Sequence, residues 1–187
     1  YDRAIGDYSL AIAVDPKDAL AYNNRGNSYG SKGEHGKAIL DYTAAIALDP
    51  GYAAAYANRG LACIALGAYD KAVAEFSTAI SIEPGSAMAY RSRGTALARL
   101  GQHGKAIGDY SSAIALDPGN AMSYMNRGIA RAKLNEYDKA VLDYTAAIAL
   151  DPKYADAYYN RAIAYRAVGE SAKAAADDDK AVSLGKR

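Results

Sequence analysis

The feature that most constrains this chain is an internal repeat with a period of about 34 residues. The ten residues DYTAAIALDP at 41–50 return letter for letter at 143–152, three periods later, and edited copies lie at 7–16, 75–84 and 109–118. A fixed period of this length is typical of stacked supersecondary units, each of which packs mainly on its neighbours. The length of 187 residues therefore reflects the number of repeats, and the repeats need not share one central core.

Each repeat predicts two amphipathic helices joined by a turn. In the first complete repeat, the spacing of Tyr22, Gly26 and Tyr29 places all three on one helical face. After a turn, a second stripe with helical spacing consists of Ala38, Ile39, Tyr42, Ala45 and Ile46. The successive repeats begin at Ala19, Ala53, Ala87, Ala121 and Ala155.

Residues with particular backbone roles mark the expected helix ends. The left-handed backbone of a helix C-terminus suits the residues that follow the first helices, namely Gly33, Gly67, Gly101, Asn135 and Gly169. Proline cannot continue a helix, and the second helices are followed by Pro50, Pro84, Pro118 and Pro152. N-cap oxygens for the next helix are expected from Asp18, Ser86 and Asn120.

Small residues predict where helices approach closely. Glycine recurs in the first helices at Gly26, Gly60, Gly94 and Gly128. These glycines are expected to pack against small residues of the second helices, namely Ala38, Ala72, Ala106 and Ala140. Large tyrosines would then fill the remaining space.

Charge and composition exclude several classes of partner. The 22 basic and 21 acidic residues nearly cancel, so the chain lacks the basic surface typical of nucleic-acid or membrane-surface binders. No stretch approaches the roughly 20 apolar residues of a membrane span. We therefore expect neither nucleic acid nor a membrane as partner. Because the chain starts at Tyr1 in the middle of a repeat, we expect it to be a fragment, and the lack of a targeting segment then carries no information.

Candidate catalytic and metal-binding groups are few. His35 and His103 fall in or beside turns of different repeats, and no neighbouring side chains complete a metal site or a triad. The acidic run 177–179 is interpreted as a solvated polar end, because adjacent helix residues diverge by about 100°. A single cysteine, Cys63, excludes an intramolecular disulfide and is interpreted as a small buried filler. We expect no catalytic residue, no metal and no cofactor.

The pattern resembles the tetratricopeptide repeat. The residues that carry the resemblance in the first complete repeat are Tyr22, Gly26, Tyr29, Ala38, Tyr42, Ala45 and Pro50. The resemblance covers essentially the whole chain. It implies an all-α fold, a right-handed superhelical solenoid of antiparallel helix pairs in which the first helices line a concave groove.

On this resemblance, residues 1–187 form a single solenoid. Residues 1–18 supply the second helix of a truncated repeat, and residues 155–187 form the terminal repeat. The full repeats between them are 19–52, 53–86, 87–120 and 121–154.

Arginine in the first helices departs from the family pattern, which has a leucine-like residue there. The arginines are Arg25, Arg59, Arg93, Arg127 and Arg161. Each follows an acid of the preceding repeat, as Arg25 follows Asp7 and Arg59 follows Asp41. The array is either functional or a ladder of structural ion pairs between packed helices, and we favour the ladder, which would fix the register of the helices.

Asparagines recur at one aligned position of the first helices, as Asn24, Asn58, Asn126 and Asn160, with Ser92 in the third full repeat. The resemblance places this position in the groove, and such a ladder resembles the asparagine arrays that hold a peptide backbone in some repeat domains of this family. A carboxamide both donates and accepts, so it can pair with the N–H and C=O of an extended residue. The alternative is that asparagine is merely a soluble helix-face residue.

Further candidate peptide-binding residues lie at the other groove positions. They are Met88, Arg91, Arg99, Met122, Met125, Lys133 and Tyr159. Methionines adapt to varied ligands, and the basic residues favour an acidic partner. The family's carboxylate clamp for chaperone C-termini is excluded, because Met88 and Ser92 stand where it needs basic residues.

The function expected is that of a non-enzymatic scaffold or adaptor that binds an extended peptide or a partner helix in its groove. One alternative is the substrate-recognition arm of a larger enzyme. Another is a self-associating scaffold, a homo-oligomer built through the exposed ends of the solenoid.

Overall fold

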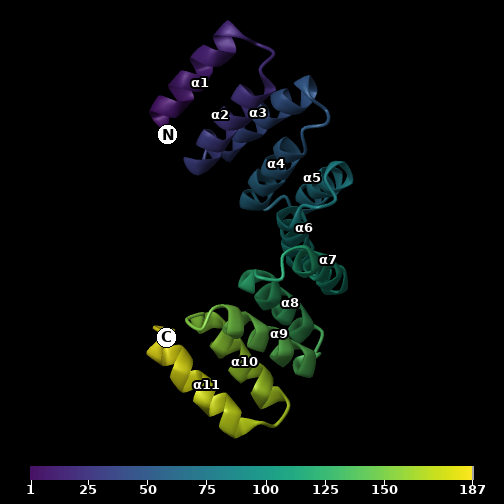
Figure 1. Cartoon of the computed structure of the whole chain (residues 1–187), viewed down its shortest axis with the longest axis vertical. Coiled ribbons are helices and arrows are strands. Elements are labelled where there is room, and N and C mark those ends of the chain that lie inside the picture. The colour runs from purple at the N-terminus through teal and green to yellow at the C-terminus, as the bar shows by residue number, and fades with distance from the viewer. Residues whose placement is uncertain (187) are drawn as a thin grey trace. The chain divides into compact units, whose positions relative to one another are not determined.

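The computed structural model describes residues 1–186, which contain eleven α-helices and no strand (Figure 1). The first helices of the repeats are α2 (Ala19–Ser31), α4 (Ala53–Ala65), α6 (Ala87–Arg99), α8 (Ala121–Lys133) and α10 (Ala155–Ala167). The second helices are α1 (Asp2–Val14), α3 (His35–Leu48), α5 (Tyr69–Ile82), α7 (His103–Leu116), α9 (Tyr137–Leu150) and α11 (Ser171–Ser183). The predicted all-α fold of repeated helix pairs is confirmed.

The chain divides into two compact units, Tyr1–Ala96 (unit 1) and Leu97–Arg187 (unit 2), with the boundary inside α6. Within unit 1, α2 packs on α1, α3 and α4; within unit 2, α8 packs on α7 and α9, and α10 packs on α9 and α11. These helices therefore pack mainly on their sequence neighbours, as expected for a repeat structure. None of the helices within 1–186 is both long enough and apolar enough to cross a bilayer.

Local sequence signals end the helices as predicted. A positive φ follows every complete first helix, for example 72° at Gly67 and 60° at Asn135. N-caps are formed by Asp18, whose carboxylate accepts from the Ala21 N–H at 2.9 Å, and by Asn120, which accepts from the Ser123 N–H at 3.1 Å. The aspartates that precede the prolines also stabilise the turns between repeats. Asp49, for example, accepts from the Gly51 N–H at 2.9 Å.

The packing of the helix pairs corrects one prediction. The four alanines of the second helices are fully buried, as expected, but they are not the nearest neighbours of the first-helix glycines. A Cβ placed on Gly128 would lie 2.6 Å from the Tyr144 ring, and one on Gly60 would lie 2.9 Å from the Phe76 ring. Glycine is therefore needed because a buried aromatic ring lies flat against the helix backbone.

The arginine ladder is structural, but its register differs from the prediction. The guanidinium pairs with the acid of its own repeat on the following helix, not with the acid of the preceding repeat. The N–O distance is 2.7 Å for Arg25–Asp41, 2.8 Å for Arg59–Glu75 and 2.7 Å for both Arg127–Asp143 and Arg161–Asp177. The preceding repeat supplies a hydroxyl instead, such as Ser9, which accepts from Arg25 at 3.1 Å.

The arginines Arg25, Arg59, Arg127 and Arg161 each thereby contact three kinds of partner. In addition to the acid and the hydroxyl, the guanidinium lies over a tyrosine of its own helix, 5.6 Å from the ring centre of Tyr22 in the case of Arg25. The hydrogen bond to Asp41 raises the pKa of Arg25 above its ordinary value, and Asp177 does the same for the pKa of Arg161. A guanidinium offers several donors in a fixed fork, which explains why lysine does not occupy this position.

Two further predictions concern single residues. The prediction of a solvated acidic end was wrong for Asp177. This side chain is 6 % exposed because it pairs with Arg161 as the acid of the arginine ladder. Its neighbour Asp178 pairs with Arg166. Cys63 is a buried free thiol, as predicted, and burial raises the pKa of that thiol.

Candidate functional site

The surface with functional potential is formed by first-helix side chains that are not used in packing. In unit 1 this first-helix face comprises Leu20, Asn24, Asn27, Ala54, Asn58, Leu61, Met88 and Arg91. In unit 2 it comprises Arg99, Met122, Asn126, Ile129, Lys133, Tyr159, Asn160 and Ile163. Helical spacing brings the members of each helix to one side, because residues about two turns apart share a face.

Large apolar side chains are exposed on this face. Met122 is 53 % exposed and Ile129, two turns later on α8, is 36 % exposed. In unit 1, Leu20 is 57 % exposed and Leu61 is 43 % exposed. Leu61, Ile129 and Ile163 were missed by the sequence reasoning; the signal was their spacing of two turns from Ala54, Met122 and Asp156 at the preceding groove position.

Three asparagines of unit 1 are linked to one another. The Asn58 amide of α4 donates to the Asn23 oxygen of α2 at 3.0 Å, and Asn23 donates to the Asn24 oxygen at 3.5 Å. This arrangement uses one N–H of Asn58 and leaves its carbonyl oxygen and second N–H for other partners. The carboxamides of neighbouring repeats therefore hold each other in fixed positions, with Asn23 buried and Asn24 and Asn58 half-buried.

The asparagines of unit 2 are placed differently. Asn160 donates to the Asp156 carbonyl of its own helix at 2.8 Å, and Asn126 is half-buried. Ser92, the exception in the ladder, lies in unit 1, is 8 % exposed and donates to the Met88 sulfur at 3.5 Å. The ladder members Asn24 of α2 and Asn58 of α4 are thus linked through Asn23, which is not itself a member of the predicted ladder.

The other predicted residues separate into surface and core. Met88, Arg99, Met122, Lys133 and Tyr159 are exposed, and Arg91 is half-buried. Met125 is not on the surface: it is 4 % exposed and belongs to the core cluster formed with side chains of α9 and α10. This placement removes Met125 from the set of surface residues that a ligand can contact directly.

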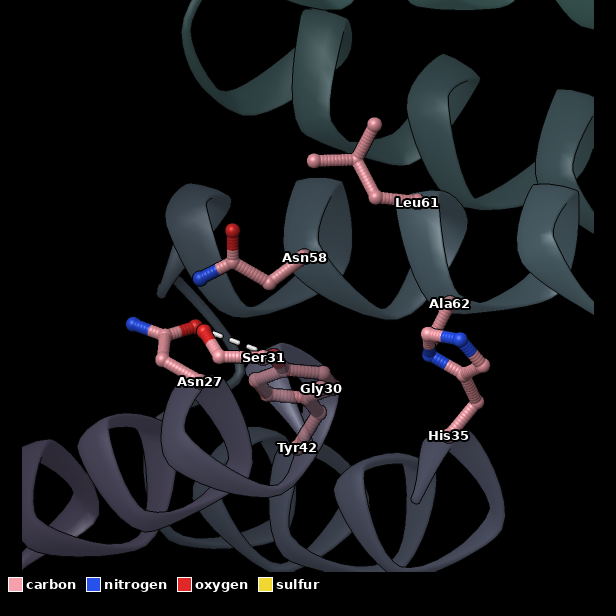
Figure 2. A pocket seen from close by; sticks show the side chains of 8 residues that line it. All are labelled: Asn27, Gly30, Ser31, His35, Tyr42, Asn58, Leu61 and Ala62. Atoms are coloured by element: carbon pink, nitrogen blue, oxygen red, sulfur yellow. Dashed lines mark hydrogen bonds between the residues drawn. The ribbon is translucent and has the colours of Figure 1, made fainter. Parts of the chain in front are cut away.

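A pocket of about 420 Å³ opens on the first-helix face of unit 1. It is lined by Asn27, Gly30 and Ser31 of α2, His35 and Tyr42 of α3, and Asn58, Leu61 and Ala62 of α4 (Figure 2). At its base the Tyr42 hydroxyl donates to the Asn27 oxygen at 2.9 Å. Burial, with a smaller contribution from Asp41, raises the pKa of Tyr42 to about 12.

The pocket exists because one side chain is missing. The residues aligned with Gly30 in the later repeats are Ile64, Ala98, Ala132 and Arg166. A Cβ at Gly30 would lie 3.6 Å from the Tyr42 hydroxyl, so a larger side chain there would fill the space. The sequence reasoning assigned Tyr42 to the core alone and gave no role to Gly30 or Asn27.

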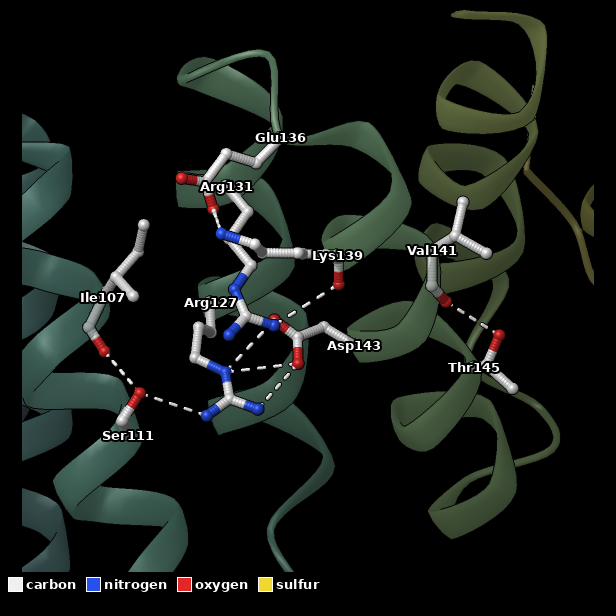
Figure 3. Close-up of polar contacts among 9 residues, drawn as sticks. All are labelled: Ile107, Ser111, Arg127, Arg131, Glu136, Lys139, Val141, Asp143 and Thr145. Atoms are coloured by element: carbon white, nitrogen blue, oxygen red, sulfur yellow. Dashed lines mark hydrogen bonds and ion pairs between the residues drawn. The ribbon is translucent and has the colours of Figure 1, made fainter. Parts of the chain in front are cut away.

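Unit 2 carries a charged cluster on α7, α8 and α9. The Asp143 carboxylate, only 3 % exposed, accepts from Arg127 at 2.7 Å and from Arg131 at 2.9 Å (Figure 3). Arg127 also donates to Ser111 at 3.1 Å, and Arg131 donates to the Lys139 carbonyl at 3.4 Å. These contacts join α7, α8 and α9 and give the cluster a structural role.

The two histidines lie far apart in the sequence and on different helices. His35 and His103 are the first residues of α3 and α7 and belong to different units. Among residues 1–186, no group of three or more histidine, cysteine, aspartate or glutamate side chains is arranged to hold a metal ion.

Comparison with known proteins identifies the repeat. A family model described as "TPR repeat" matches residues 1–33, 60–101 and 130–169, more than half of the chain. A second model, "Tetratricopeptide repeat", matches residues 19–52. No curated protein sequence matches the chain.

Solved structures share the fold. The crystal structure of YrrB, titled as a TPR protein with an unusual peptide-binding site, is 27 % identical with a TM-score of 0.81, covering 95 % of this chain and 92 % of YrrB. A crystal structure of MamA is 26 % identical with a TM-score of 0.81, covering 85 % and 93 %. MamA from Desulfovibrio magneticus RS-1 is 21 % identical with a TM-score of 0.84, covering 89 % and 94 %, and shows similarity of fold alone.

Proposed function

The chain belongs to the tetratricopeptide repeat family, and from this premise we propose that it is a protein-interaction module that binds an extended peptide along its first-helix face. The observation that carries the proposal is the linked set of the buried Asn23 and the half-buried Asn24 and Asn58, whose amides are held in fixed positions beside exposed apolar side chains. The resemblance to YrrB, a TPR protein with an unusual peptide-binding site, supports the same class of ligand.

The chemistry of the face suits a peptide backbone. Each free carboxamide group can donate to a peptide C=O or accept from a peptide N–H, and each such bond contributes about 1 kcal/mol net. Leu20, Leu61 and Met122 add apolar contact without a deep, shaped pocket for each side chain. We infer binding that tolerates varied sequences through several weak contacts.

Charge adds a preference to this binding. Arg99 and Lys133 are exposed in unit 2, and Arg91 is half-buried in unit 1. Fixed positive charges at a binding surface favour an acidic segment and weaken with added salt. The preferred partner is therefore an acidic peptide segment.

The test is selection from a random peptide library, followed by affinity measurement with the variants Asn58→Ala and Asn126→Ala. Each substitution is expected to weaken binding about fivefold, the equivalent of one hydrogen bond. The matched controls are Thr78→Ala in α5 and Ser112→Ala in α7, because each hydroxyl bonds only a carbonyl of its own helix. Unchanged affinity in both asparagine variants would remove the asparagines from the binding site.

A second candidate function is self-association. Helix α1 has no buried residue, and its Leu10 and Val14 are 68 % and 87 % exposed. A second copy of the chain packed on this helix would cover them. Sedimentation at increasing concentration tests the idea, and a strict monomer throughout would exclude it. The recognition arm of a larger enzyme, the other alternative, would use the same first-helix face.

A further inference from the structure

We propose that the unit 1 pocket lined by Asn27, Gly30, Tyr42 and Asn58 is a specificity subsite for a carboxamide side chain, glutamine or asparagine, of the bound segment. The inference rests on the proposed peptide-binding function. It goes further by naming one side chain that the segment must carry and the residues that recognise it.

The polar groups of the pocket match both ends of a carboxamide. The Asn27 oxygen already accepts the Tyr42 hydroxyl proton at 2.9 Å, so the Asn27 amide group is left to donate. The Asn58 amide donates to Asn23 at 3.0 Å, so its carbonyl oxygen is left to accept. A ligand carboxamide supplies an oxygen for the first group and N–H donors for the second.

The lining contains neither an acid nor a lysine or arginine. A lysine side chain that entered would lose water without gaining an opposite charge, which is unfavourable. A glutamate could accept from donors such as His35 but has no N–H to give to the Asn58 oxygen. A leucine would desolvate the Asn27 amide without satisfying it. An uncharged side chain that both donates and accepts is therefore the class that fits.

Size and shape favour a side chain with methylene groups before its polar end. The pocket volume of about 420 Å³ has room for a side chain with several methylene groups. Leu61 and Ala62 of α4 supply the apolar part of the lining, on which the methylenes of glutamine can pack, and the polar side chains come from α2, α3 and, at Asn58, α4 (Figure 2).

The pocket also lies where a bound backbone would pass. Asn58 lines the pocket and is at the same time the α4 member of the linked asparagines. A peptide whose backbone bonds to these amides therefore has a side chain within reach of the pocket. The backbone contact with the asparagines determines which peptide residue lies beside the pocket, and the pocket determines which amino acid is preferred there.

The next repeat shows that this chemistry is particular to one place. There Leu61 aligns with Asn27, Ile64 with Gly30 and Phe76 with Tyr42, so the asparagine amide and the tyrosine hydroxyl that bonds to it are both absent at these positions. The combination of Asn27, Gly30 and Tyr42 occurs in a single repeat of the sequence. One carboxamide position per bound segment follows.

The experiment is a positional scan of a peptide selected from the random library, with glutamine, asparagine, glutamate, lysine, leucine and serine placed at each position. One position should prefer glutamine or asparagine over the other residues by about tenfold, the value of one to two hydrogen bonds. In Gly30→Leu, which fills the pocket, this preference should disappear while the remaining positions keep their pattern. Gly36→Leu, on α3 with open space around it, is the control and should keep the preference.

The outcomes separate this inference from the proposed function. Thermal unfolding should show Gly30→Leu to be at least as stable as the parent, because leucine favours helix and a Cβ at Gly30 makes an ordinary contact. Asparagine-dependent peptide binding without a carboxamide position, or a preference that survives Gly30→Leu, would overturn the subsite and leave the proposed function standing. Failure to select any peptide would overturn both.

Discussion

At the scale of single residues, Asp143 pairs with more arginines than any other ladder acid for which contacts are described. It is buried and accepts from both Arg127 and Arg131, whereas Asp41 accepts from Arg25. Two guanidinium groups on one carboxylate leave a net positive charge in a mostly buried cluster. Loss of the acid should therefore be far more harmful than loss of the second arginine.

We predict that Asp143→Asn lowers the free energy of unfolding by about 3 kcal/mol, because it leaves two partly buried arginines without an opposite charge. Arg131→Leu should change it by less than about 1 kcal/mol, since Arg127 still pairs with Asp143. Urea unfolding followed by circular dichroism measures both. Equal effects of the two substitutions would contradict this account of the cluster.

Tyr42 predicts a loss of stability in alkali. Its pKa is raised by burial from the ordinary 10.0 to about 12, so the folded chain retains a proton that the unfolded chain releases. The stabilisation is complete below pH 10 and is lost as pH rises from 10 to about 12. Tyr42→Phe should reduce this decline without abolishing it, because burial also raises the pKa of Tyr144. The free energy of unfolding is measured by urea unfolding between about pH 9 and pH 11. An identical decline with pH in the parent and in Tyr42→Phe would contradict this role of Tyr42.

At the scale of the elements, glycines of similar appearance have opposite roles. In α8, Gly128 faces the Tyr144 ring, and a Cβ would lie 2.6 Å from it. In α7, Gly108 has open space where its side chain would be. The first glycine is required by packing, and the second only weakens its helix.

Alanine at the two positions should therefore shift stability in opposite directions. Gly128→Ala is expected to destabilise unit 2 by about 1–3 kcal/mol through overpacking. Gly108→Ala is expected to stabilise it by about 0.5–1 kcal/mol through helix propensity. Thermal unfolding of the two variants measures the difference, and a shared sign would show that ring packing does not decide the role of Gly128.

Helix boundaries could be predicted from the sequence because their causes are local. The left-handed backbone at Gly67, the cap at Asp18 and the prolines act within a few residues. The partner of Arg25 could not be predicted in this way. Asp7 of the preceding repeat and Asp41 of the same repeat are both acids at the aligned position, and only the packing of α2 on α3 selects Asp41. Periodicity reveals that a contact recurs, but it does not identify the neighbour.

The candidate site was predictable only in part for a similar reason. The asparagines are visible as a recurring residue, whereas the pocket depends on the missing side chain of Gly30 and on residues from three helices. Met125 illustrates the converse, since a groove position by alignment is buried among side chains of α9 and α10. Exposure depends on the local packing of each repeat.

At the scale of the whole molecule, the repeated and the varied parts of the sequence have different tasks. The identical stretches 41–50 and 143–152 lie in and just after the second helices α3 and α9, where their alanines and tyrosines form the core. The first helices carry the residues that differ between repeats at exposed positions, such as Leu20 and Met122. We therefore expect ligand recognition on the first helices and stability from the second.

The measurement that tests this division most directly is nuclear magnetic resonance of the labelled protein with a library-selected peptide added. The amide and side-chain carboxamide signals of α2, α4, α8 and α10 should shift on binding, with Asn24, Asn58 and Asn126 among them. The exposed residues of α3, α5, α7 and α9 should remain unchanged. Shifts concentrated on those second helices, with the asparagine signals unaffected, would contradict the proposed binding surface.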